Sequence, residues 1–542
     1  MNSNTVYKAF SSTCEEFGSH PFLHIPDTAA PYNTGSIDAS YQKTLEKIDS
    51  LASTYENAGY KINTRIGLFL ENRIDFFYHW LALNKLGCSV IPLHPDMQSG
   101  EIAYFLEHGE AVLVVSLPYK KSELEEICAN INNKPPVIST DESTYIPAAK
   151  SFSQNNDIPS GSTECALLYT SGSTGKPKGC ILDNNYFLYA GYWYNSIGGL
   201  MELKRGQERL LTPLPLNHMN AMACSSMAMI MSGGCIIQLD RFHPKTWWES
   251  VRSSRATILH YLGVLPAILL EQPKSADDDF SEQIKFGFGA GVNPKHHDIF
   301  EKRFGFPLLE AWAMTESGAG GSIIANHEPR HIGTCCFGKP ESWLEYQLVD
   351  EKKQVVSLGE PGELRVRRVG DNSAKGFFSG YFKNPEATKE IWQDGWLNTG
   401  DVVREDENGY LYFVDRRKNV IRRSGENIAA LEVEAGLVGA PGVLEALVTA
   451  VPDEIRGEEV AVCVVPKTKL DTGEQTAHGI VNYALKTLTY FKVPGYVIFC
   501  EALPRTSSNK PKRAEVKSLA KEYVEKGKFF DTRHLKKRAH KQ

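Results

Sequence analysis

The sequence predicts an α/β protein with a large N-terminal domain of α/β subdomains plus a small β-rich subdomain, followed by a small α+β C-terminal domain. Three observations lead to this prediction. The chain has 542 residues, which is too long for a single hydrophobic core. Apolar runs of strand length alternate with helical patterns through most of it. After about residue 330, short alternating strands joined by glycine and charged turns replace that pattern.

The N-terminal part contains short apolar runs typical of buried strands, RIGLFL at 65–70 and AVLVVSL at 111–117. Between them, DFFYHWLALNKLG has a helical pattern and ends at Gly87. The uncharged run at 221–239 nearly has the length of a membrane span. However, Gly233 and Gly234 divide it, and its last residues have strand character. We interpret the run as a buried helix, a turn and a strand, and expect no integral membrane segment.

The second half of the chain has a different pattern of strands and helices. WLEYQLVD, GELRVRR and GYLYFVDRR, between residues 343 and 417, predict a small antiparallel sheet or barrel. EALVTAVP and EVAVCVVP read as strands, and AHGIVNYALKTL reads as a helix, so a separate α+β domain is expected there. We place the boundary at Arg416, which divides the chain into domains 1–415 and 416–542.

Charge and cysteine usage exclude several classes of protein. The net charge is −6, and no basic stripe with interleaved aromatic residues points to a nucleic-acid partner. The N-terminus, MNSNTVYKAF, lacks the basic region and apolar core of a secretory signal. The 11 cysteines are scattered without a CxxC pair, which favours unpaired buried thiols over disulfides or zinc. We therefore expect a cytoplasmic protein.

The run LLYTSGSTGKPKG, at 167–179, places hydroxyls, glycines and lysines directly after an apolar strand, as phosphate-binding loops do. It is not a Walker A loop, because Gly172 and Gly175 are only three residues apart and Pro177 follows Lys176. Its glycines still let backbone N–H groups approach an anion, and Lys178 adds positive charge. The alternative is a flexible Ser/Gly loop. The hydroxyl donors are Thr170, Ser171, Ser173 and Thr174.

A second loop, KFGFGAGVNPKHHDIFEKRFG, has the form strand, glycine turn, helix. Its glycines are spaced GxGxG and not GxGxxG, so it is a weak dinucleotide signal. A tight turn at Gly289 to Gly291, against a bound purine or acyl group, fits equally well. A nicotinamide-dependent oxidoreductase and a non-catalytic nucleotide-binding module therefore stay open as alternatives.

Five motifs, in this order, resemble the adenylate-forming superfamily, which includes acyl-CoA synthetases, peptide-synthetase adenylation domains and firefly luciferase. They are YTSGSTGKPKG, AWAMTESG, GWLNTGDVV, VDRRKNVIRRSGENI and LPRTSSNKPKR, beginning at residues 169, 311, 395, 414 and 503. The resemblance implies that a carboxylate attacks the α-phosphate of ATP, giving an acyl-adenylate and pyrophosphate, and that a thiol then displaces AMP. Because both partners of the first step are anions, positive charge and oriented N–H groups must offset their repulsion.

The resemblance assigns expected roles in ATP binding. Thr315 and Glu316 match a pair that contacts phosphate and Mg²⁺, and Trp312 takes the place of an aromatic residue, more often Tyr, that stacks on adenine. Asp401 matches the carboxylate that holds the ribose hydroxyls, and Arg416 matches a second ribose contact. The residues expected at the β- and γ-phosphates are Thr170, Ser171, Gly172, Ser173, Thr174, Gly175 and Lys178.

Other residues match the catalytic lysine, the hinge and the thiol tunnel of the family, which serve different half-reactions. Lys510 matches the catalytic lysine of adenylation, with Asn509 where a glycine is usual. Lys418 falls at the hinge about which the mobile C-terminal domain rotates between the half-reactions. The segment RRSGENI then lines a thiol tunnel, in which Gly425 would let pantetheine pass close to the backbone. Such a motion suits a two-step enzyme, because one site must present two sets of groups.

The acyl pocket is expected to be lined by Trp193, by His218 and Met219 of LPLNHMNAM, and by the turn from Gly289 to Gly291. His218 aligns with a ring that gates the carboxylate in relatives, and the alternative is a core histidine. Trp193 and its neighbours Tyr192 and Tyr194 are expected where this pocket begins.

The expected activity is that of an AMP-forming acyl-CoA synthetase using ATP, Mg²⁺ and coenzyme A. No carrier-protein segment follows Lys510, so free CoA is the expected acceptor. FVDRRKNVIRRSGENIAALEVE and RATILHYLGVLPAILLEQPKSADD look most like the crotonobetaine/carnitine-CoA ligases. A small carboxylic acid of that kind is the expected substrate, with another short-chain or aryl acid, or another thiol, as alternatives. The oligomeric state is left open, a homodimer included.

Overall fold

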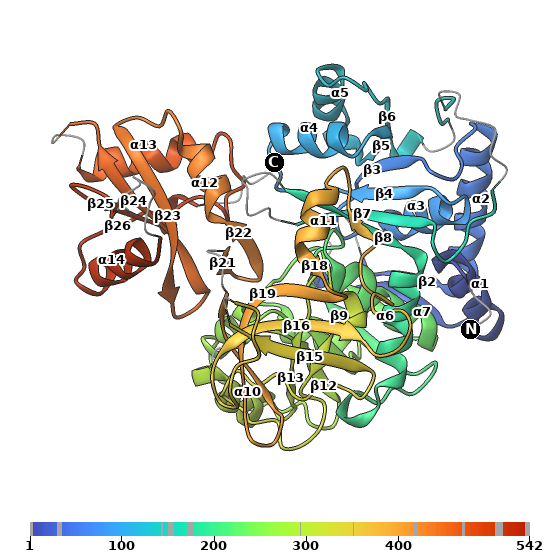
Figure 1. Ribbon diagram of the computed structural model, residues 1–542. Helices are drawn as coiled ribbons and strands as arrows, with labels where there is room; N and C mark the ends of the chain where they lie inside the picture. Colours follow the sequence, from blue (N-terminus) through green and yellow to red (C-terminus); the bar gives the residue numbers. More distant parts are fainter. Residues whose placement is uncertain are drawn as a thin grey trace.

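A computed structural model describes residues 4–29, 35–142, 145–149, 157–170, 177–292, 294–350, 352–416, 420–468, 472–504 and 513–536. Figure 1 shows a large N-terminal part, coloured blue through yellow into light orange, and a smaller C-terminal unit, coloured darker orange to red, at one side of it. Three sheets belong to the large part and one to the small unit.

The first sheet consists of β3 (Arg65–Phe69), β4 (Ser89–Pro92), β5 (Ala111–Ser116), β6 (Val137–Ser139), β7 (Glu164–Thr170), β8 (Lys178–Asp183) and β17 (Gly380–Tyr381). Its order is β17-β8-β7-β4-β3-β5-β6. The apolar runs at 65–70 and 111–117 form the neighbouring parallel strands β3 and β5. Strands β7 and β8 pair antiparallel, with Thr170 at the end of β7 opposite Lys178 at the start of β8.

The second sheet consists of β1 (Pro21–Ile25), β2 (Ile37–Ser40), β9 (Arg209–Thr212), β10 (Cys235–Gln238), β11 (Ile258–His260), β12 (Phe286–Gly289), β13 (Leu308–Trp312) and β14 (Ile323–Ile324). Its order is β14-β13-β12-β11-β9-β10-β1-β2, and β9 to β13 and β1 run parallel. Neighbouring residues of one strand enter different cores: Leu210 packs in the central core and Leu211 in the outer one. Both faces are covered, which explains the continuous apolar runs.

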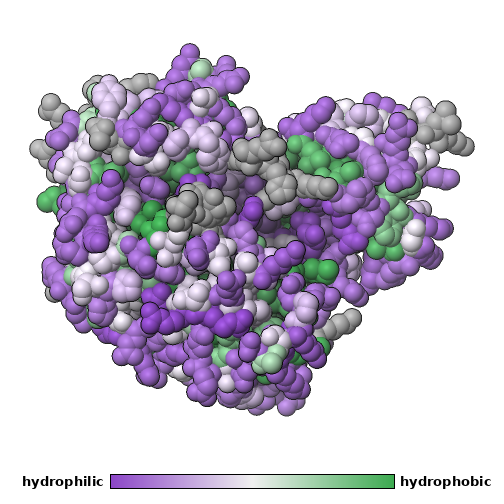
Figure 2. Space-filling view, turned by 180° about the vertical axis from the view of Figure 1, so that it is seen from behind, coloured by the Kyte–Doolittle hydropathy of each residue, from purple (hydrophilic) through white to green (hydrophobic). Residues whose placement is uncertain are grey.

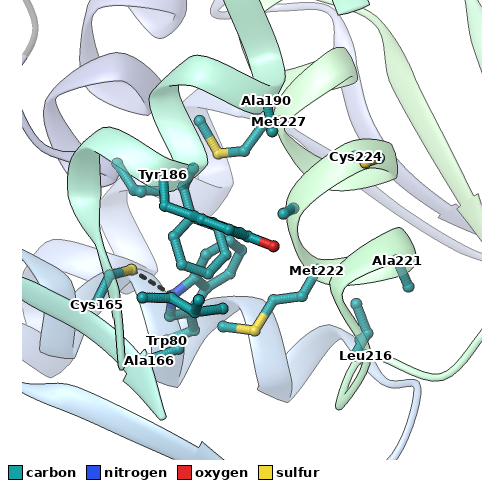
Figure 3. Packing of buried hydrophobic residues seen from close by; sticks show 14 of the residues in the cluster. Trp80, Cys165, Ala166, Tyr186, Ala190, Leu216, Ala221, Met222, Cys224 and Met227 are labelled. Carbon is teal, nitrogen blue, oxygen red and sulfur yellow. Dashed lines mark hydrogen bonds between the residues drawn. The ribbon is translucent and has the colours of Figure 1, made fainter. Parts of the chain in front are cut away.

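Helices fill the space between these two sheets and cover their outer faces. The central layer contains α1 (Val6–Phe17), α2 (Tyr41–Asn57), α3 (Ile74–Lys85), α6 (Asn184–Ser196) and α7 (Ser226–Ser232). The outer layers contain α4 (Ser99–His108) and α5 (Lys121–Ala129) on the first sheet, and α8 (Trp247–Ser253), α9 (Val264–Leu270) and α10 (Pro294–Phe304) on the second. Figure 3 shows Trp80, Tyr186, Met222 and Met227 meeting in the central layer, where the Trp80 indole donates to Cys165 Sγ at 3.3 Å.

The run at 221–239 folds as the sequence predicts. A π-helix (Asn220–Ser225) leads into α7, Gly233 ends that helix with φ = +72°, and β10 follows. None of the helices in the described part of the chain combines the length and apolar character that a membrane span requires. All 11 cysteines are unpaired thiols and all but Cys335 are buried, as predicted.

The third sheet is antiparallel, which confirms the prediction for residues 343–417. It consists of β15 (Leu344–Val349), β16 (Gly362–Arg368), β18 (Trp392–Gln393), β19 (Trp396–Glu405) and β20 (Leu411–Arg416), with α11 (Pro385–Ile391) beside it. It lies next to the end of the second sheet (Figure 1), so that β19 approaches β13.

The C-terminal unit has its own sheet and its own cores. It consists of β21 (Val420–Arg423), β22 (Glu426–Ala429), β23 (Val443–Asp453), β24 (Gly457–Pro466), β25 (Tyr496–Phe499) and β26 (Phe530–Asp531), with α12 (Ala430–Leu437), α13 (Glu474–Ala484) and α14 (Arg513–Glu525). One core packs α12 and α13 on the sheet, and a second packs α14 on its other face. The predicted fold class, a large α/β part followed by a small α+β domain, is confirmed; the boundary at 415/416 stays a prediction.

Short helical turns complete the architecture. They are Asp27–Ala29, Pro118–Lys120, Thr140–Glu142, Gly199–Met201, Gly318–Gly320 and Arg533–Leu535.

Candidate active site

Glu316 is the point at which three distant segments meet. Its carboxylate is buried, and its Oε1 accepts hydrogen bonds from Tyr381 Oη at 2.6 Å and Thr170 Oγ1 at 3.3 Å. Thr170 ends β7 and Tyr381 lies in β17, so the first sheet supplies both donors. Burial and the neighbouring Glu316 raise the pKa of Tyr381, so its hydroxyl stays protonated and keeps donating. The Lys178 ammonium lies 4.8 Å from the centre of the Tyr381 ring.

The two ends of the predicted phosphate loop therefore lie beside Glu316. Thr170 and Lys178 face each other across β7 and β8. The loop's other predicted residues, Ser171, Gly172, Ser173, Thr174 and Gly175, lie outside the described residues. Thr315 is half buried, and its carbonyl accepts from Tyr186 Oη at 2.9 Å, which ties this segment to α6.

Trp312 and Asp401 contact each other directly. The sequence predicts that the first stacks on adenine and that the second binds the ribose hydroxyls. The Trp312 indole Nε1 donates to Asp401 Oδ2 at 2.9 Å, and both side chains are buried. Asp401 stands opposite Arg416 in the pairing of β19 with β20. The side chain of Arg416, and the whole of Lys418 and Lys510, lie outside what the structure describes.

The glycine turn after β12 is engaged by a carboxylate of the protein itself. Glu310 accepts from the backbone N–H of Gly291 at 2.8 Å and of Val292 at 3.2 Å, and from Tyr261 Oη at 2.8 Å. Gly291 has φ = +78°, and a Cβ on Gly289 would lie 2.4 Å from the Tyr261 carbonyl. These glycines therefore serve the packing of the turn. An anionic pyrophosphate would compete with Glu310 for the same N–H groups, which counts against a dinucleotide cradle here.

Trp193 lies deep in the central layer and close to a buried polar network. Its ring centre is 6.3 Å from that of Phe288, and within the described part of the chain its indole N–H has no hydrogen-bond acceptor. Nearby, His260 Nε2 lies 2.9 Å from Tyr194 Oη, and its Nδ1 lies 2.8 Å from Ser225 Oγ. Burial lowers the pKa of His260 to about 3, so the ring is neutral at physiological pH.

Tyr192 does not share this environment. It is 47% exposed and packs near Tyr189, while Trp193 and Tyr194 are buried. Successive residues of α6 point about 100° apart around the helix, so Tyr192 reaches the surface although its two neighbours are buried. A place for these three residues at the start of the acyl pocket stays a prediction.

A cavity of about 250 Å³ lies between the large part and the C-terminal unit. Figure 2 shows the surface indented between the two. From the large part the cavity is lined by the segment after β4, the segment after β9 and the start of α9, with His94 and Leu262 among the residues. From the C-terminal unit, Ser424, Glu426 and Phe491 line it. The predicted tunnel segment is thus part of its wall.

The turn between β21 and β22 is shaped by close packing. Ser424 has φ = +54° and Gly425 has φ = +84°. A Cβ on Gly425 would lie 2.2 Å from Leu262 Cδ1, so a glycine is needed for both its conformation and its contact.

His218 faces this turn across the interface. Its Nε2 lies 3.6 Å from Glu426 Oε2, its side chain is 44% exposed, and Met219 next to it is half buried against the central core. Burial alone would raise the pKa of Glu426, but His218, His94 and Lys492 lower it to about 2. His218 is therefore not a core histidine.

Several residues of this site carried no recognisable signal in the sequence. Tyr381 is one tyrosine in a two-residue strand, and only the fold places it on Glu316. His94 follows β4 and becomes notable only because its ring lies 5.9 Å from that of Phe491 in the C-terminal unit. Glu310 occupies an ordinary strand position whose neighbours along the chain do not reveal its contact with the glycine turn.

Family sequence models and several known proteins match this chain. The sequence model of the family described as AMP-binding enzyme matches residues 19–382, and that of the AMP-binding enzyme C-terminal domain matches residues 432–510. The crotonobetaine/carnitine–CoA ligase of Escherichia coli is 28% identical over 497 residues, covering 88% of this chain and 93% of its own. That of Proteus mirabilis is 28% identical over 488 residues, covering 87% and 91%.

Two solved structures share the fold over nearly the whole chain. The o-succinylbenzoate CoA synthetase of Bacillus subtilis superposes with a TM-score of 0.80 at 23% identity, covering 94% of this chain and 98% of its own. The amide bond synthetase of Marinactinospora thermotolerans superposes with a TM-score of 0.77 at 22% identity, covering 94% and 99%.

Proposed function

The chain belongs to the family of AMP-binding enzymes, and from this membership we propose that it joins a small carboxylic acid to coenzyme A through an acyl-adenylate. It is an adenylate-forming ligase of the acyl-CoA synthetase kind. The proposed reaction consumes ATP and releases AMP and pyrophosphate. The observation that supports it best is that Thr170, at one end of the phosphate loop, and Tyr381 both donate to the buried carboxylate of Glu316. Lys178, at the other end of the loop, pairs opposite Thr170 and lies near the Tyr381 ring.

We propose ATP-binding roles for the residues around Glu316 and for the hydrogen-bonded pair of Trp312 and Asp401. Lys178 and the loop that begins after Thr170 bind the terminal phosphates, with Thr315 beside them. The Trp312 ring packs against adenine, and Asp401 holds the ribose hydroxyls. The hydrogen bond from Trp312 to Asp401 supports this pairing, because it fixes the two side chains relative to each other as a rigid binding site requires.

The carboxylate of Glu316 fits a magnesium ion. Mg²⁺ prefers oxygen ligands and is commonly held by one or two carboxylates together with substrate phosphates. Tyr381 and Thr170 both donate to Oε1, which fixes the direction of the carboxylate. Bound there, the ion would neutralise phosphate charge.

The C-terminal unit is proposed to serve the two half-reactions in turn. In the arrangement described here, the turn at Gly425 lines the cavity, as expected for the step in which a thiol enters. We propose that the cavity admits the pantetheine arm of CoA, and that rotation about Lys418 brings Lys510 to the carboxylate and α-phosphate for adenylation.

The reaction itself is the first test. Purified protein with Mg²⁺, ATP, CoA and a panel of acids should exchange labelled pyrophosphate into ATP in an acid-dependent way, and should form AMP and acyl-CoA. A product set of ADP and phosphate without AMP would refute the proposal. Exchange without any thioester would instead point to a different acceptor, while a nicotinamide-dependent turnover would support the oxidoreductase alternative.

For the acid, we propose a short chain with a trimethylammonium head group, as in the relatives named crotonobetaine/carnitine–CoA ligases. The aromatic ring of Trp193 could hold such a cation, contributing about 0.5–2 kcal/mol. His260, next to it in the fold, is uncharged and would not repel the head group.

Substrate preference is the second test. We expect kcat/KM to be higher for crotonobetaine or carnitine than for butyrate, benzoate or a long-chain fatty acid, and the preference over butyrate to shrink in Trp193→Leu. Butyrate as the better substrate would refute the cation proposal. A preference for the long-chain acid would refute the small pocket, and either outcome leaves the CoA-ligase reaction untouched.

A further inference from the structure

A buried ion cluster joins the two parts of the molecule beside the cavity. The ammonium of Lys492 lies 2.5 Å from Glu101 Oε1 and 2.6 Å from Glu432 Oε1. Thr489 Oγ1 donates to the other oxygen of Glu101 at 2.6 Å. All three charged side chains are at most 15% exposed, so water screens their interaction only weakly.

Only one member of the cluster belongs to the large part. Glu101 lies in the first turn of α4, where its Oε2 also accepts from the backbone N–H of Gln98 at 3.0 Å, which fixes the side chain. Thr489 and Lys492 follow α13, and Glu432 lies in α12. If the C-terminal unit rotates away, Lys492 keeps Glu432, and the bonds to Glu101 are the ones that break.

The charges of the cluster favour the closed contact. Burial opposes ionisation of Glu101, but Lys492, together with the hydrogen bonds from Thr489 and the Gln98 backbone, outweighs it and lowers the pKa of that carboxyl. Burial likewise disfavours the charged form of Lys492, but Glu101 and Glu432 raise its pKa. The pair is therefore ionised in this arrangement, and removing one partner of such a buried pair is far more disruptive than removing an exposed one.

The cluster is adjacent to the groups that define the cavity. Tyr490 and Phe491, directly before Lys492, line it, and the Phe491 ring meets His94 of the large part. His218 of the large part contacts Glu426, which also lines the cavity from the C-terminal unit. A restraint at Lys492 thus fixes the side of the C-terminal unit that closes the cavity.

We propose that Glu101 and Lys492 form a latch that holds the C-terminal unit in the thiol-transfer arrangement. This inference rests on the proposed function. The two are positioning residues, because neither needs to contact the reacting atoms. The latch favours thioester formation and must release before the next adenylation.

Glu101→Gln is the central test, because the amide keeps the shape and an acceptor for Thr489 but removes the charge. Thioester formation from synthetic acyl-adenylate and CoA should slow about tenfold, equivalent to about 1.4 kcal/mol, while pyrophosphate exchange stays within about twofold of wild type. Glu107→Gln is the matched control on the same helix, since Glu107 binds Asn132 within the large part; it should leave both steps unchanged.

A charge exchange separates the latch from a general structural effect. Lys492→Glu alone places three carboxylates together and should slow thioester formation more than Glu101→Gln. Glu101→Lys combined with Lys492→Glu again places one ammonium between two carboxylates and should restore the rate. Equal slowing of both half-reactions in Glu101→Gln, or failure of the double variant to recover, would overturn the proposal.

Small-angle X-ray scattering of the substrate-free protein tests the latch without relying on the reaction. Glu101→Gln should increase the radius of gyration or broaden the distance distribution relative to wild type and Glu107→Gln, with thermal stability retained. An unchanged scattering curve would overturn the latch even if the enzyme proves to be a CoA ligase. If wild type forms no acyl-CoA, the proposed function fails, and the scattering result still decides whether the contact holds the two parts together.

Discussion

Glu316→Gln should slow acyl-adenylate formation by about 10²–10³-fold, the range seen when one preorganised electrostatic contact is lost. The amide can still accept the hydrogen bonds of Tyr381 and Thr170, so the packing around it should survive. The negative charge that would hold the magnesium ion is removed. The loss should appear in pyrophosphate exchange at saturating acid and be partly relieved at high Mg²⁺.

Two measurements separate this from a loss of fold. Circular dichroism and the thermal midpoint of Glu316→Gln should match wild type. Glu386→Gln, an exposed position in the first turn of α11 near Tyr381, should retain full activity. A variant that unfolds, or one that exchanges pyrophosphate at the wild-type rate, would show that Glu316 is a structural residue and not part of the ATP site.

The sequence predicted most of the fold because local pattern and burial agree. The runs at 65–70 and 111–117 became central parallel strands, since strands covered on both faces must be apolar throughout. The antiparallel sheet was predicted from the short alternating strands that replace the α/β pattern after about residue 330. The C-terminal α+β unit was predicted from the strand and helix patterns that come after that sheet. These features depend on neighbours in sequence, which is why a single chain reveals them.

The contacts within the site could not be predicted in the same way. The motifs pointed to Trp312 and Asp401 separately, but their mutual hydrogen bond joins strands of two different sheets. Tyr381 reaches Glu316 from β17, a strand of two residues with no pattern of its own. The glycine turn was ambiguous in sequence because its decisive partner, Glu310, lies about twenty residues away on the next strand. Such pairings depend on how sheets meet, which local pattern does not encode.

Gly425→Ala should slow thioester formation by about 10²-fold, the size expected when a reacting group is displaced by about 1 Å. Its φ of +84° is strained for alanine, and the new Cβ would lie 2.2 Å from Leu262 Cδ1 at the wall of the cavity. The turn must shift, either into the proposed thiol path or away from the large part. Adenylation should stay within about threefold of wild type, because the proposal places this turn away from the site during that step.

The matched control is Gly527→Ala in the same unit. Gly527 also has a positive φ, +65°, but a Cβ there meets nothing within 4 Å. It therefore carries the backbone strain, about 1–2 kcal/mol, without the contact, and should slow neither half-reaction. Adding Leu262→Ala to Gly425→Ala removes the two closest contacts, with Cδ1 at 2.2 Å and Cγ at 2.9 Å, and leaves only Cβ at 3.1 Å. The double variant should recover part of the thioester rate. If both glycine variants behave alike, or if Gly425→Ala impairs adenylation as strongly as thiol transfer, then Gly425 contributes only to the stability of the C-terminal unit, and the thiol must reach the adenylate by another route.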